Sequence, residues 1–278
     1  MLPCVGSIAN TAPAWSGGKD MEQERSFSEY LRSFSEGASP LDFMLIYDHL
    51  DRFFYGALVT LELTFLALVL GGLLAIPMAI ARAYKTPVLN PAIWSFTYLF
   101  RGTPLLVQLY LIYYGLGQFE AVRDSFLWDP ILSSPWWCVL IAFVLNSSAY
   151  TTEFLRGAIE TTPAGEIEAA KACGMTPFTR MRLVVLPSAF RRALPAYSNE
   201  VIFTIHGSAI ASLVTIQDLL GVGRWLNGRY YLAYEGFVTA MVFYMIIVFI
   251  ITRIFRLAEK RYLGHLRSRD TNALVVQP

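Results

Sequence analysis

Charged residues are scarce in this sequence. Asp, Glu, Lys and Arg together make up 15% of the 278 residues, whereas hydrophobic residues make up 55%. The charges almost cancel, at a net charge of +1, so no overall positive field favours nucleic acid as a partner. A soluble domain of this length carries more charge, and the apolar residues here occur in long runs. The composition therefore predicts an all-α protein that crosses a lipid bilayer several times.

Motifs for several kinds of chemistry are also missing. The three cysteines, Cys4, Cys138 and Cys173, lack the paired spacing of a disulfide framework or a metal site. The three histidines are scattered as well. No phosphate loop of the form GxxxxGK[ST] occurs, so the chain is not expected to hydrolyse ATP itself. We therefore expect no catalytic residues, no metal and no cofactor bound by this chain.

The N-terminal segment has the features of neither a span nor a secretory signal. Residues 1–40 are rich in Ser, Gly, Ala and Glu and lack a basic flank followed by an apolar core. We expect most of this extension to have little fixed structure. Met21 is a candidate for the true start, which mass spectrometry of the native N-terminus would test. The predicted domains are this extension, a transmembrane domain over 41–265 and a C-terminal tail over 266–278.

Five apolar runs are each long enough to cross a bilayer core of ~30 Å, which takes roughly 20 helical residues. The second run is interrupted at Arg101-Gly102-Thr103-Pro104, and the fourth carries several polar residues. Neither of these two is expected to be a plain lipid-facing helix. The predicted spans are 56–81, 92–117, 135–156, 192–214 and 233–255.

Lys and Arg are unevenly distributed among the connecting loops. They concentrate in loops 82–91 and 157–191 and after the fifth span, whereas loops 118–134 and 215–232 carry few. Because Lys and Arg favour the cytoplasmic side of a membrane, the first group and the C-terminus are expected in the cytoplasm. The N-terminus is then expected on the periplasmic side, as an odd number of spans requires.

Segment 161–187, TTPAGEIEAAKACGMTPFTRMRLVVLP, contains the capping and terminating residues of two short helices. Thr162 is placed to cap the first helix, Gly174 to end it in a left-handed conformation, and Thr176 to cap the second. Pro187 marks a stop or a bend before the fourth span. Small residues form a shallow face that another protein could approach closely: Ala169, Ala170 and Cys173. From local chemistry alone, a solvated connecting loop is equally compatible with this segment.

Several ordered motifs then resemble one family, over roughly residues 41–265. The spacing of Glu168-Ala169-Ala170, Gly174 and Val184-Val185-Leu186-Pro187 resembles the EAA motif of ABC importer permeases, although that family usually has isoleucine at the position of Val184. Three further stretches resemble the polar-amino-acid branch of the family: RGTPL (101–105), AYTTE (149–153) and LPAYSNEVIFTIHGSA (194–209). Within that branch the likeness is to M-type membrane subunits of histidine/lysine/arginine/ornithine transporters, with opine permeases as near relatives.

The resemblance implies a transport subunit of the bacterial inner membrane and not an enzyme. It implies a permease that moves polar, cationic amino acids (His, Arg, Lys or ornithine), with an opine or another polar amino acid as the alternative substrate. The residues it assigns to the cytoplasmic coupling helix are Glu168, Ala169, Ala170, Gly174 and Pro187. The implied partners are a second permease subunit, identical or different, two ATP-binding subunits that use ATP and Mg, and a periplasmic substrate-binding protein.

Two other classes of protein are weighed against this one. An ion-coupled secondary transporter usually has internal repeats and more spans, and neither is found in the sequence. An integral membrane enzyme needs a cluster of convergent catalytic residues near one interface, and the scattered Ser, His and Cys residues form none. ATP-dependent uptake that an uncoupler leaves unchanged would exclude the secondary transporter.

Polar residues within the predicted spans are candidates for a substrate pathway, because charges in apolar spans usually face a cavity or a partner. Glu153 shares a helix face with Asn146 and Tyr150. Its carboxylate is placed either to bind a cationic substrate or to form an ion pair with Arg156.

Glu200 begins a polar stripe with Thr204, Ser208 and Ser212, at intervals of four residues. Lining a wet pathway explains this stripe, and hydrogen bonding between helices is the alternative. The neighbouring Asn199 is placed either to bind substrate or to hold an adjacent helix.

Arg101 precedes the predicted break in the second span. It is placed to bind a substrate carboxylate or, as we favour, to pin the break through an internal ion pair, with Glu62 as a candidate partner. His206 is assigned to packing or gating in preference to ligand binding, and a metal role is not expected because no companion metal ligands accompany it.

Overall fold

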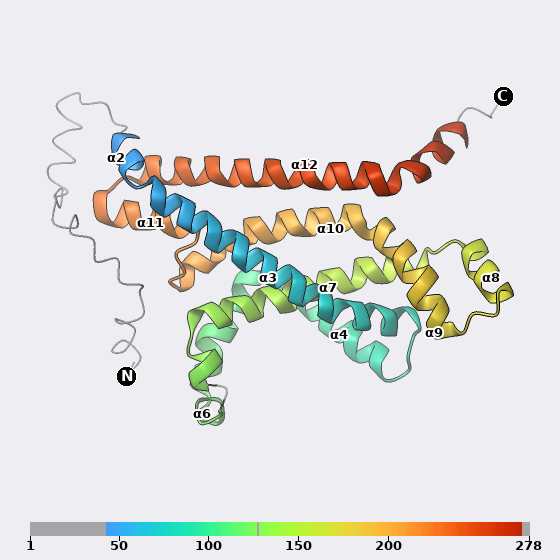
Figure 1. Ribbon diagram of the computed structural model, residues 1–278. Coiled ribbons are helices and arrows are strands. Elements are labelled where there is room, and N and C mark those ends of the chain that lie inside the picture. Colours follow the sequence, from blue (N-terminus) through green and yellow to red (C-terminus); the bar gives the residue numbers. More distant parts are fainter. Residues whose placement is uncertain (1–42, 127, 274–278) are drawn as a thin grey trace.

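A computed structural model describes residues 43–126 and 128–273, and its regular structure is helical throughout those ranges (Figure 1). The all-α prediction is therefore confirmed for the described residues. The predicted extension over 1–40 lies outside them. The longer elements in chain order are α3 (Leu50–Ala83), α4 (Leu89–Gly102), α7 (Pro135–Glu160), α10 (Leu186–Ser208), α11 (Leu219–Tyr230) and α12 (Ala233–Ala273).

Shorter elements connect these helices. They are α2 (Phe43–Asp48), α5 (Leu105–Tyr110), α6 (Glu120–Arg123), α8 (Ala164–Ala172) and α9 (Pro177–Arg180), with π-helical turns at Leu111–Gly115, Trp128–Leu132 and Met181–Val185 and 3₁₀ turns at Leu116–Gln118 and Ala209–Val214. The turn at Met181–Val185 adjoins both α9 and α10, so the chain stays helical into the fourth predicted span. Pro187 in the first turn of α10 therefore does not stop the helix.

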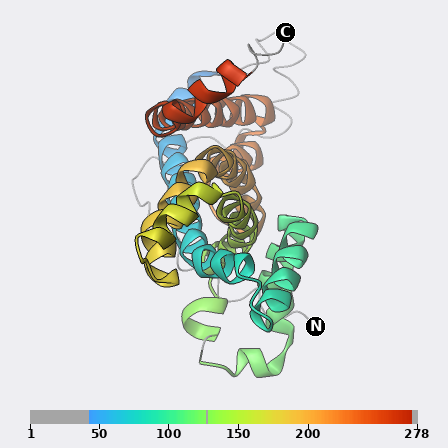
Figure 2. The same cartoon turned by 90° about the vertical axis from the view of Figure 1, so that its right-hand side faces the viewer.

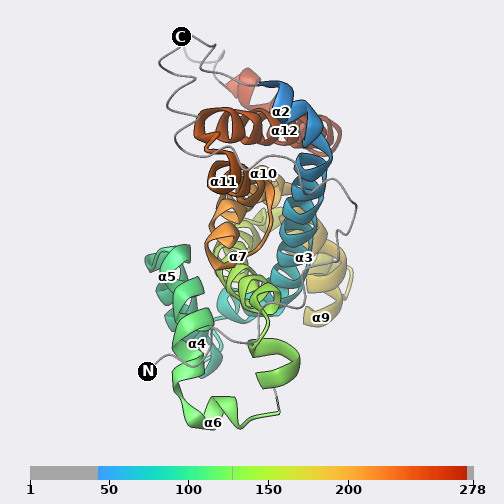
Figure 3. The same ribbon diagram turned by 90° about the vertical axis from the view of Figure 1, so that its left-hand side faces the viewer.

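Helix α7 occupies the centre of the molecule, and α3, α4 and α10 pack against it. Viewed from the two ends, α12 lies along one edge and α4 near the opposite edge, with α7 and α10 between them (Figures 2 and 3). Helices α3 and α7 approach each other closely at Gly71, where an added Cβ would lie 3.2 Å from the Ser148 nitrogen and the Val144 oxygen. A larger residue at this position would push the two helices apart.

The most apolar part of α7 is 61% buried within the chain, whereas that of α12 is only 6% buried. One face of α12 packs against α10 and α11, and the rest of its apolar surface faces lipid or another protein. It also continues as one helix to Ala273, past the predicted start of the tail at residue 266.

Three described helices are long and apolar enough to cross a membrane: α3, α7 and α12 up to Tyr262. A fourth is added if Pro177–Val214 and Leu219–Tyr230, bent by 40° at a short break, count as one span. The second predicted span is divided at residues 103 and 104 and does not reach this standard. The structure therefore supports a polytopic membrane protein, while the count of five spans stays a prediction.

Helix α11 lies in the loop 215–232, where the sequence suggested no helix. Thr215 adopts a left-handed backbone conformation, with φ of 71°, and ends the preceding 3₁₀ turn. Asp218 then caps α11, since its Oδ1 accepts a hydrogen bond of 2.9 Å from the Gly221 amide. This is ordinary N-cap chemistry.

The loops that the distribution of Lys and Arg separates lie at opposite ends of the molecule. Helices α8 and α9 and the C-terminal part of α12 gather at one end, and α2, α6 and α11 lie at the other (Figure 1). The grouping of the loops is therefore reproduced, and the side of the membrane that each end faces stays a prediction.

Candidate functional site

A groove of about 820 Å³ runs between α7 and α10. Its volume falls in the range of small-molecule sites. Most residues predicted for the substrate pathway line it: Arg101, Tyr150, Glu153, Asn199, Glu200 and Thr204. Ser208 does not. It is fully buried, and its hydroxyl lies 3.4 Å from the Tyr244 hydroxyl of α12, so the predicted stripe divides between the groove and a helix contact.

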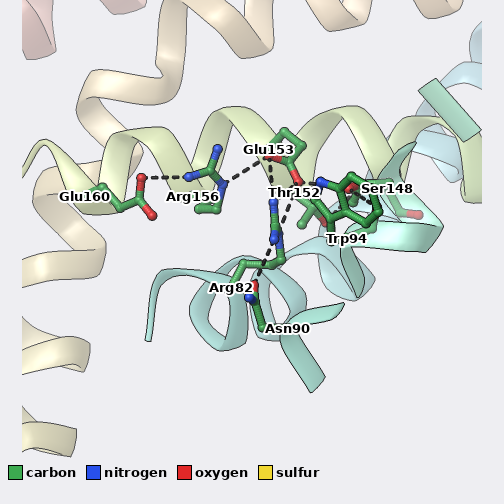
Figure 4. A network of polar contacts seen from close by, with 9 residues as sticks. Arg82, Asn90, Trp94, Ser148, Thr152, Glu153, Arg156 and Glu160 are labelled. Carbon is green, nitrogen blue, oxygen red and sulfur yellow. Dashed lines mark hydrogen bonds and ion pairs between the residues drawn. The ribbon is translucent and has the colours of Figure 1, made fainter. Parts of the chain in front are cut away.

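Glu153 is the centre of a polar network at one end of the groove (Figure 4). Its Oε1 lies 3.1 Å from Nη2 of Arg82, and its Oε2 lies 3.0 Å from Nε of Arg156. The Thr97 hydroxyl donates a third hydrogen bond, of 2.9 Å, to Oε1. The ion pair with Arg156 that the sequence suggested is therefore present, and Arg82 and Thr97 complete it.

This network joins three helices. Arg82 at the end of α3 also donates to Oδ1 of Asn90 in α4 at 2.8 Å (Figure 4). The Arg82 and Glu153 side chains are only 11% and 12% exposed. Because a poorly exposed ion pair needs extra hydrogen bonds to offset its desolvation, the surrounding donors and acceptors make the pair tenable. The Glu153 carboxylate thus braces α3, α4 and α7 in this conformation.

Glu200 has a very different environment in the same groove. It is 8% exposed, and it forms no ion pair with any residue in the described ranges. The Thr204 hydroxyl, one turn along α10, donates to the backbone oxygen of Glu200 and not to its carboxylate. A poorly exposed carboxylate without a cation is costly, so a positive group that enters the groove would be stabilised beside it.

The break between α4 and α5 is held by two amide side chains. Nε2 of Gln108 donates to the backbone oxygens of Phe100 and Thr103 at 2.8 and 3.0 Å. Nδ2 of Asn146, from α7, donates to the same Phe100 oxygen at 3.2 Å and to Oε1 of Gln108 at 3.0 Å. These bonds satisfy carbonyls that the break frees from the helix ladder.

The expected ion pair of Arg101 at the break is not formed within the described residues, and Glu62, which is exposed on α3, forms none there either. The Arg101 guanidinium carbon lies 5.4 Å from the centre of the Tyr150 ring, a cation–π distance. Arg101 therefore lines the groove without an ion pair among the described residues, and the buried Gln108, which no sequence motif indicates, supports the break in its place.

The segment 161–187 forms two short helices with the expected joint between them. Gly174 has a φ of +70°, its amide donates to the oxygen of Lys171, and the Met175 amide donates to the oxygen of Ala170. This pair of bonds is a Schellman ending. Thr176 caps the second helix, since its hydroxyl accepts from the Thr179 amide at 3.2 Å. Both predictions are confirmed.

Two details of the segment differ from expectation. Pro163 and not Thr162 occupies the N-cap position of α8, which has no side-chain cap. Ala170 is 4% exposed and packs into the protein, whereas Glu168, Ala169 and Cys173 are exposed. Ala170 is therefore not part of the exposed surface of α8, to which Glu168 and Ala169 belong.

Comparison with known proteins identifies the fold and the family. Residues 67–264 match the family described as the binding-protein-dependent transport system inner membrane component. The chain belongs to this family. All of the predicted pathway and coupling residues lie within the matched residues, and so do Arg82 and Gln108.

Three similar proteins place this permease more narrowly. It is 44% identical to the histidine/lysine/arginine/ornithine transport system permease protein HisM of Escherichia coli (strain K12), over 79% of this chain and 92% of HisM. It is 37% identical to the nopaline transport system permease protein NocM of Agrobacterium fabrum, over 82% and 95% of the two chains. A chain in the crystal structure of an amino acid ABC transporter with histidines matches with a TM-score of 0.71 at 32% identity, over 80% and 99%.

Proposed function

We propose that this permease is the membrane-spanning subunit through which an ATP-binding-cassette importer moves cationic amino acids. The observation that carries the proposal is the poorly exposed Glu200 carboxylate, which lines the groove without a cation among the described residues. A substrate guanidinium or ammonium group would supply that charge. Charge-assisted hydrogen bonds of this kind are about twice as strong as neutral ones.

Other groove residues suit the rest of an amino acid. Arg101 and Asn199 are exposed and line the same groove, so they offer donors to a substrate carboxylate. Tyr150 and Thr204 also line this groove. Glu153 lines the pathway too, but Arg82 and Arg156 balance its charge, so we assign it to shaping the groove.

The similarity to HisM supports histidine, lysine, arginine or ornithine as the substrate. The similarity to NocM supports an opine as the alternative. A screen of these compounds on the cognate binding protein, by calorimetry, would separate the two groups, because the binding protein selects what reaches the permease.

We assign the coupling role to α8 and to the joint at Gly174. Glu168, Ala169 and Gly174 are exposed and would face the ATPase. Ala170 packs inward, and Pro187 lies in the first turn of α10. The partners are then two ATP-binding subunits, which hold ATP and Mg, a second permease subunit, identical or different, and a periplasmic binding protein. In this arrangement the N-terminus is periplasmic, the C-terminus is cytoplasmic, and five spans cross the inner membrane.

Reconstitution of the complete importer in proteoliposomes tests the proposal. Uptake of labelled arginine or histidine should require ATP and the binding protein, and an uncoupler should leave it unchanged. Uptake that persists without ATP and collapses with the uncoupler would instead indicate an ion-coupled transporter.

A matched pair of variants tests the coupling joint. An added side chain at Gly174 meets no atom within 4 Å, so its φ of +70° is the only local restriction. Asn tolerates this conformation and Val does not. Gly174→Val should therefore weaken copurification of the ATPase or uncouple its hydrolysis from uptake, while Gly174→Asn should behave like the unsubstituted protein. Equal transport by both variants would remove the joint from the coupling mechanism.

A further inference from the structure

Arg192 links the base of α10 to the end of α7. Its Nη2 donates hydrogen bonds of 2.8 Å to the backbone oxygen of Ala158 and of 2.8 Å to the hydroxyl of Thr162. Its Nη1 donates a bond of 2.6 Å to the hydroxyl of Ser188, one turn earlier in α10. One guanidinium therefore holds its own helix on one side and the last turn of α7 on the other.

The Ala158 oxygen is available because α7 ends there. The Thr162 amide, which would bond to it in a continuing helix, bonds instead to the oxygen of Ile159 at 3.2 Å. The hydroxyl of Thr161 also reaches the Ala158 oxygen, at 3.3 Å. A guanidinium at this position satisfies a terminal carbonyl and lies at the negative end of the helix dipole, both of which are favourable.

The link lies next to the coupling helix. Thr162 is 7% exposed and directly precedes Pro163, the N-cap residue of α8. Glu166, in the first turn of α8, interacts electrostatically with Arg192. The guanidinium thus holds the chain one residue before α8 begins, and a charge on α8 itself acts on it.

The other end of the link leads to the groove. Asn199 and Glu200 lie seven and eight residues after Arg192 in α10, which is roughly 10 to 12 Å along a helix at 1.5 Å per residue. A displacement of α8 that moves the end of α7 therefore moves the base of α10 with it, provided that the guanidinium holds. Apolar side chains of the two helices also pack together here, among them Leu155 of α7 and Ala189 of α10, and the hydrogen bonds of Arg192 add a directed link that fixes how α7 and α10 are aligned at this point.

We propose that Arg192 is a positioning residue that transmits the movement of the coupling helix α8 to α10 and thereby to the groove. This inference rests on the proposed importer function. A lysine cannot replace the arginine fully, because its ammonium is a point charge on a flexible stem and lacks the rigid planar fork that fixes Nη2 between the Ala158 oxygen and the Thr162 hydroxyl.

The experiment compares four variants in the reconstituted importer. Arg192→Gln removes the charge and the fork, Arg192→Lys keeps the charge alone, and Thr162→Val removes one acceptor on the α7 side. Ser188→Ala is the matched control, because it removes a bond within α10 and leaves the link between the helices. Arginine uptake and ATP hydrolysis are measured on the same vesicles, together with copurification of the ATPase and thermal stability in detergent.

We expect Arg192→Gln to lower the number of substrate molecules moved per ATP by about five- to tenfold, the range of a modest coupling between sites. The complex should still assemble. Arg192→Lys should regain part of the ratio, Thr162→Val should lower it less, and Ser188→Ala should leave it unchanged.

A normal number of substrate molecules moved per ATP in Arg192→Gln would overturn the proposal. It would also be overturned if uptake and hydrolysis fell together in Arg192→Gln because assembly is lost, while Thr162→Val kept a normal number of molecules moved per ATP. If Arg192→Gln does not assemble, Thr162→Val alone decides: a lowered ratio supports the link, and a normal ratio refutes it. Failure of the unsubstituted importer to take up substrate with ATP would instead refute the proposed function.

Discussion

Glu153 and Glu200 line one groove from facing helices, yet their surroundings are opposite. Glu153 accepts from Arg82, Arg156 and Thr97, and its interactions brace three helices. Glu200 is less exposed still, and the described part of the chain supplies it with no cation.

The difference shows that an acid inside a membrane protein can do one of two jobs. An acid whose counter-charge is built into the fold is part of the framework, and its loss is felt as instability. In the proposed function, an acid without one binds a charge that the substrate brings, and we expect its loss to lower transport. Removing each acid in turn is the direct way to break this comparison.

The largest effect is expected for Glu153→Gln. This change leaves the Arg82 guanidinium, 11% exposed, without its carboxylate. Removing one partner of a poorly exposed ion pair typically costs about 3 kcal/mol or more, so the unfolding temperature in detergent should fall markedly. An unchanged unfolding temperature would show that the network does not brace the helices.

Glu200→Gln should affect transport and not stability. Removing an unpaired, poorly exposed charge should leave the unfolding temperature unchanged or raise it slightly. The KM for arginine uptake should rise about tenfold or more, since hydrogen bonds to charged groups contribute ~1.5 to 3 kcal/mol. An unaltered KM for arginine uptake would contradict the proposed role of Glu200 and the contrast drawn between Glu200 and Glu153.

Asn146→Ala sharpens the comparison with an uncharged residue that also lines the groove. Asn146 makes its hydrogen bonds within the protein, to the Phe100 oxygen and the Gln108 side chain. Its loss should cost about 1 kcal/mol of stability and change the KM for arginine less than Glu200→Gln does. A larger effect on KM than on the unfolding temperature would instead assign Asn146 to substrate.

The smallest effect is expected for Glu160→Gln, at the outer end of the same network. Glu160 is 39% exposed and pairs with Arg156 four residues earlier on α7, at 2.7 Å. Exposed pairs of this kind contribute about 0.5 kcal/mol or less. A loss as large as that of Glu153→Gln would show that the network works as a unit and not through its least exposed pair.

Much of the fold was predictable because its signals are local. The apolar runs indicated the long helices, Gly174 the left-handed joint and Thr176 a cap, each through residues within a turn or two. The helix α11 was missed, since its cap at Asp218 lies in a loop without an apolar run. Thr162 does not cap α8 because the helix begins one residue later, with Pro163 at the N-cap, and its hydroxyl instead bonds to Ile159 and to Arg192, 30 residues away.

Most of the residues predicted for the substrate pathway line the groove, but the sequence did not predict which of them contact one another. Spacing along α10 placed Glu200 and Thr204 together, but the same spacing could not show that Ser208 turns toward Tyr244 of α12. The support of the break by Gln108 and Asn146 was equally hidden, because the two amides are 38 residues apart.

The sequence by itself determined that this is a helical membrane permease, where its chain breaks and bends, and which residues are candidates for a role in transport. Each of these depends on composition, on short-range spacing or on motifs in order. Only the tertiary structure decided that Glu153 is neutralised by arginines of the protein while Glu200 forms no ion pair within the described residues. Arg82 and Glu153 are 71 residues apart in the sequence. The residues around each of them do not indicate the ion pair, because it depends on where two helices cross.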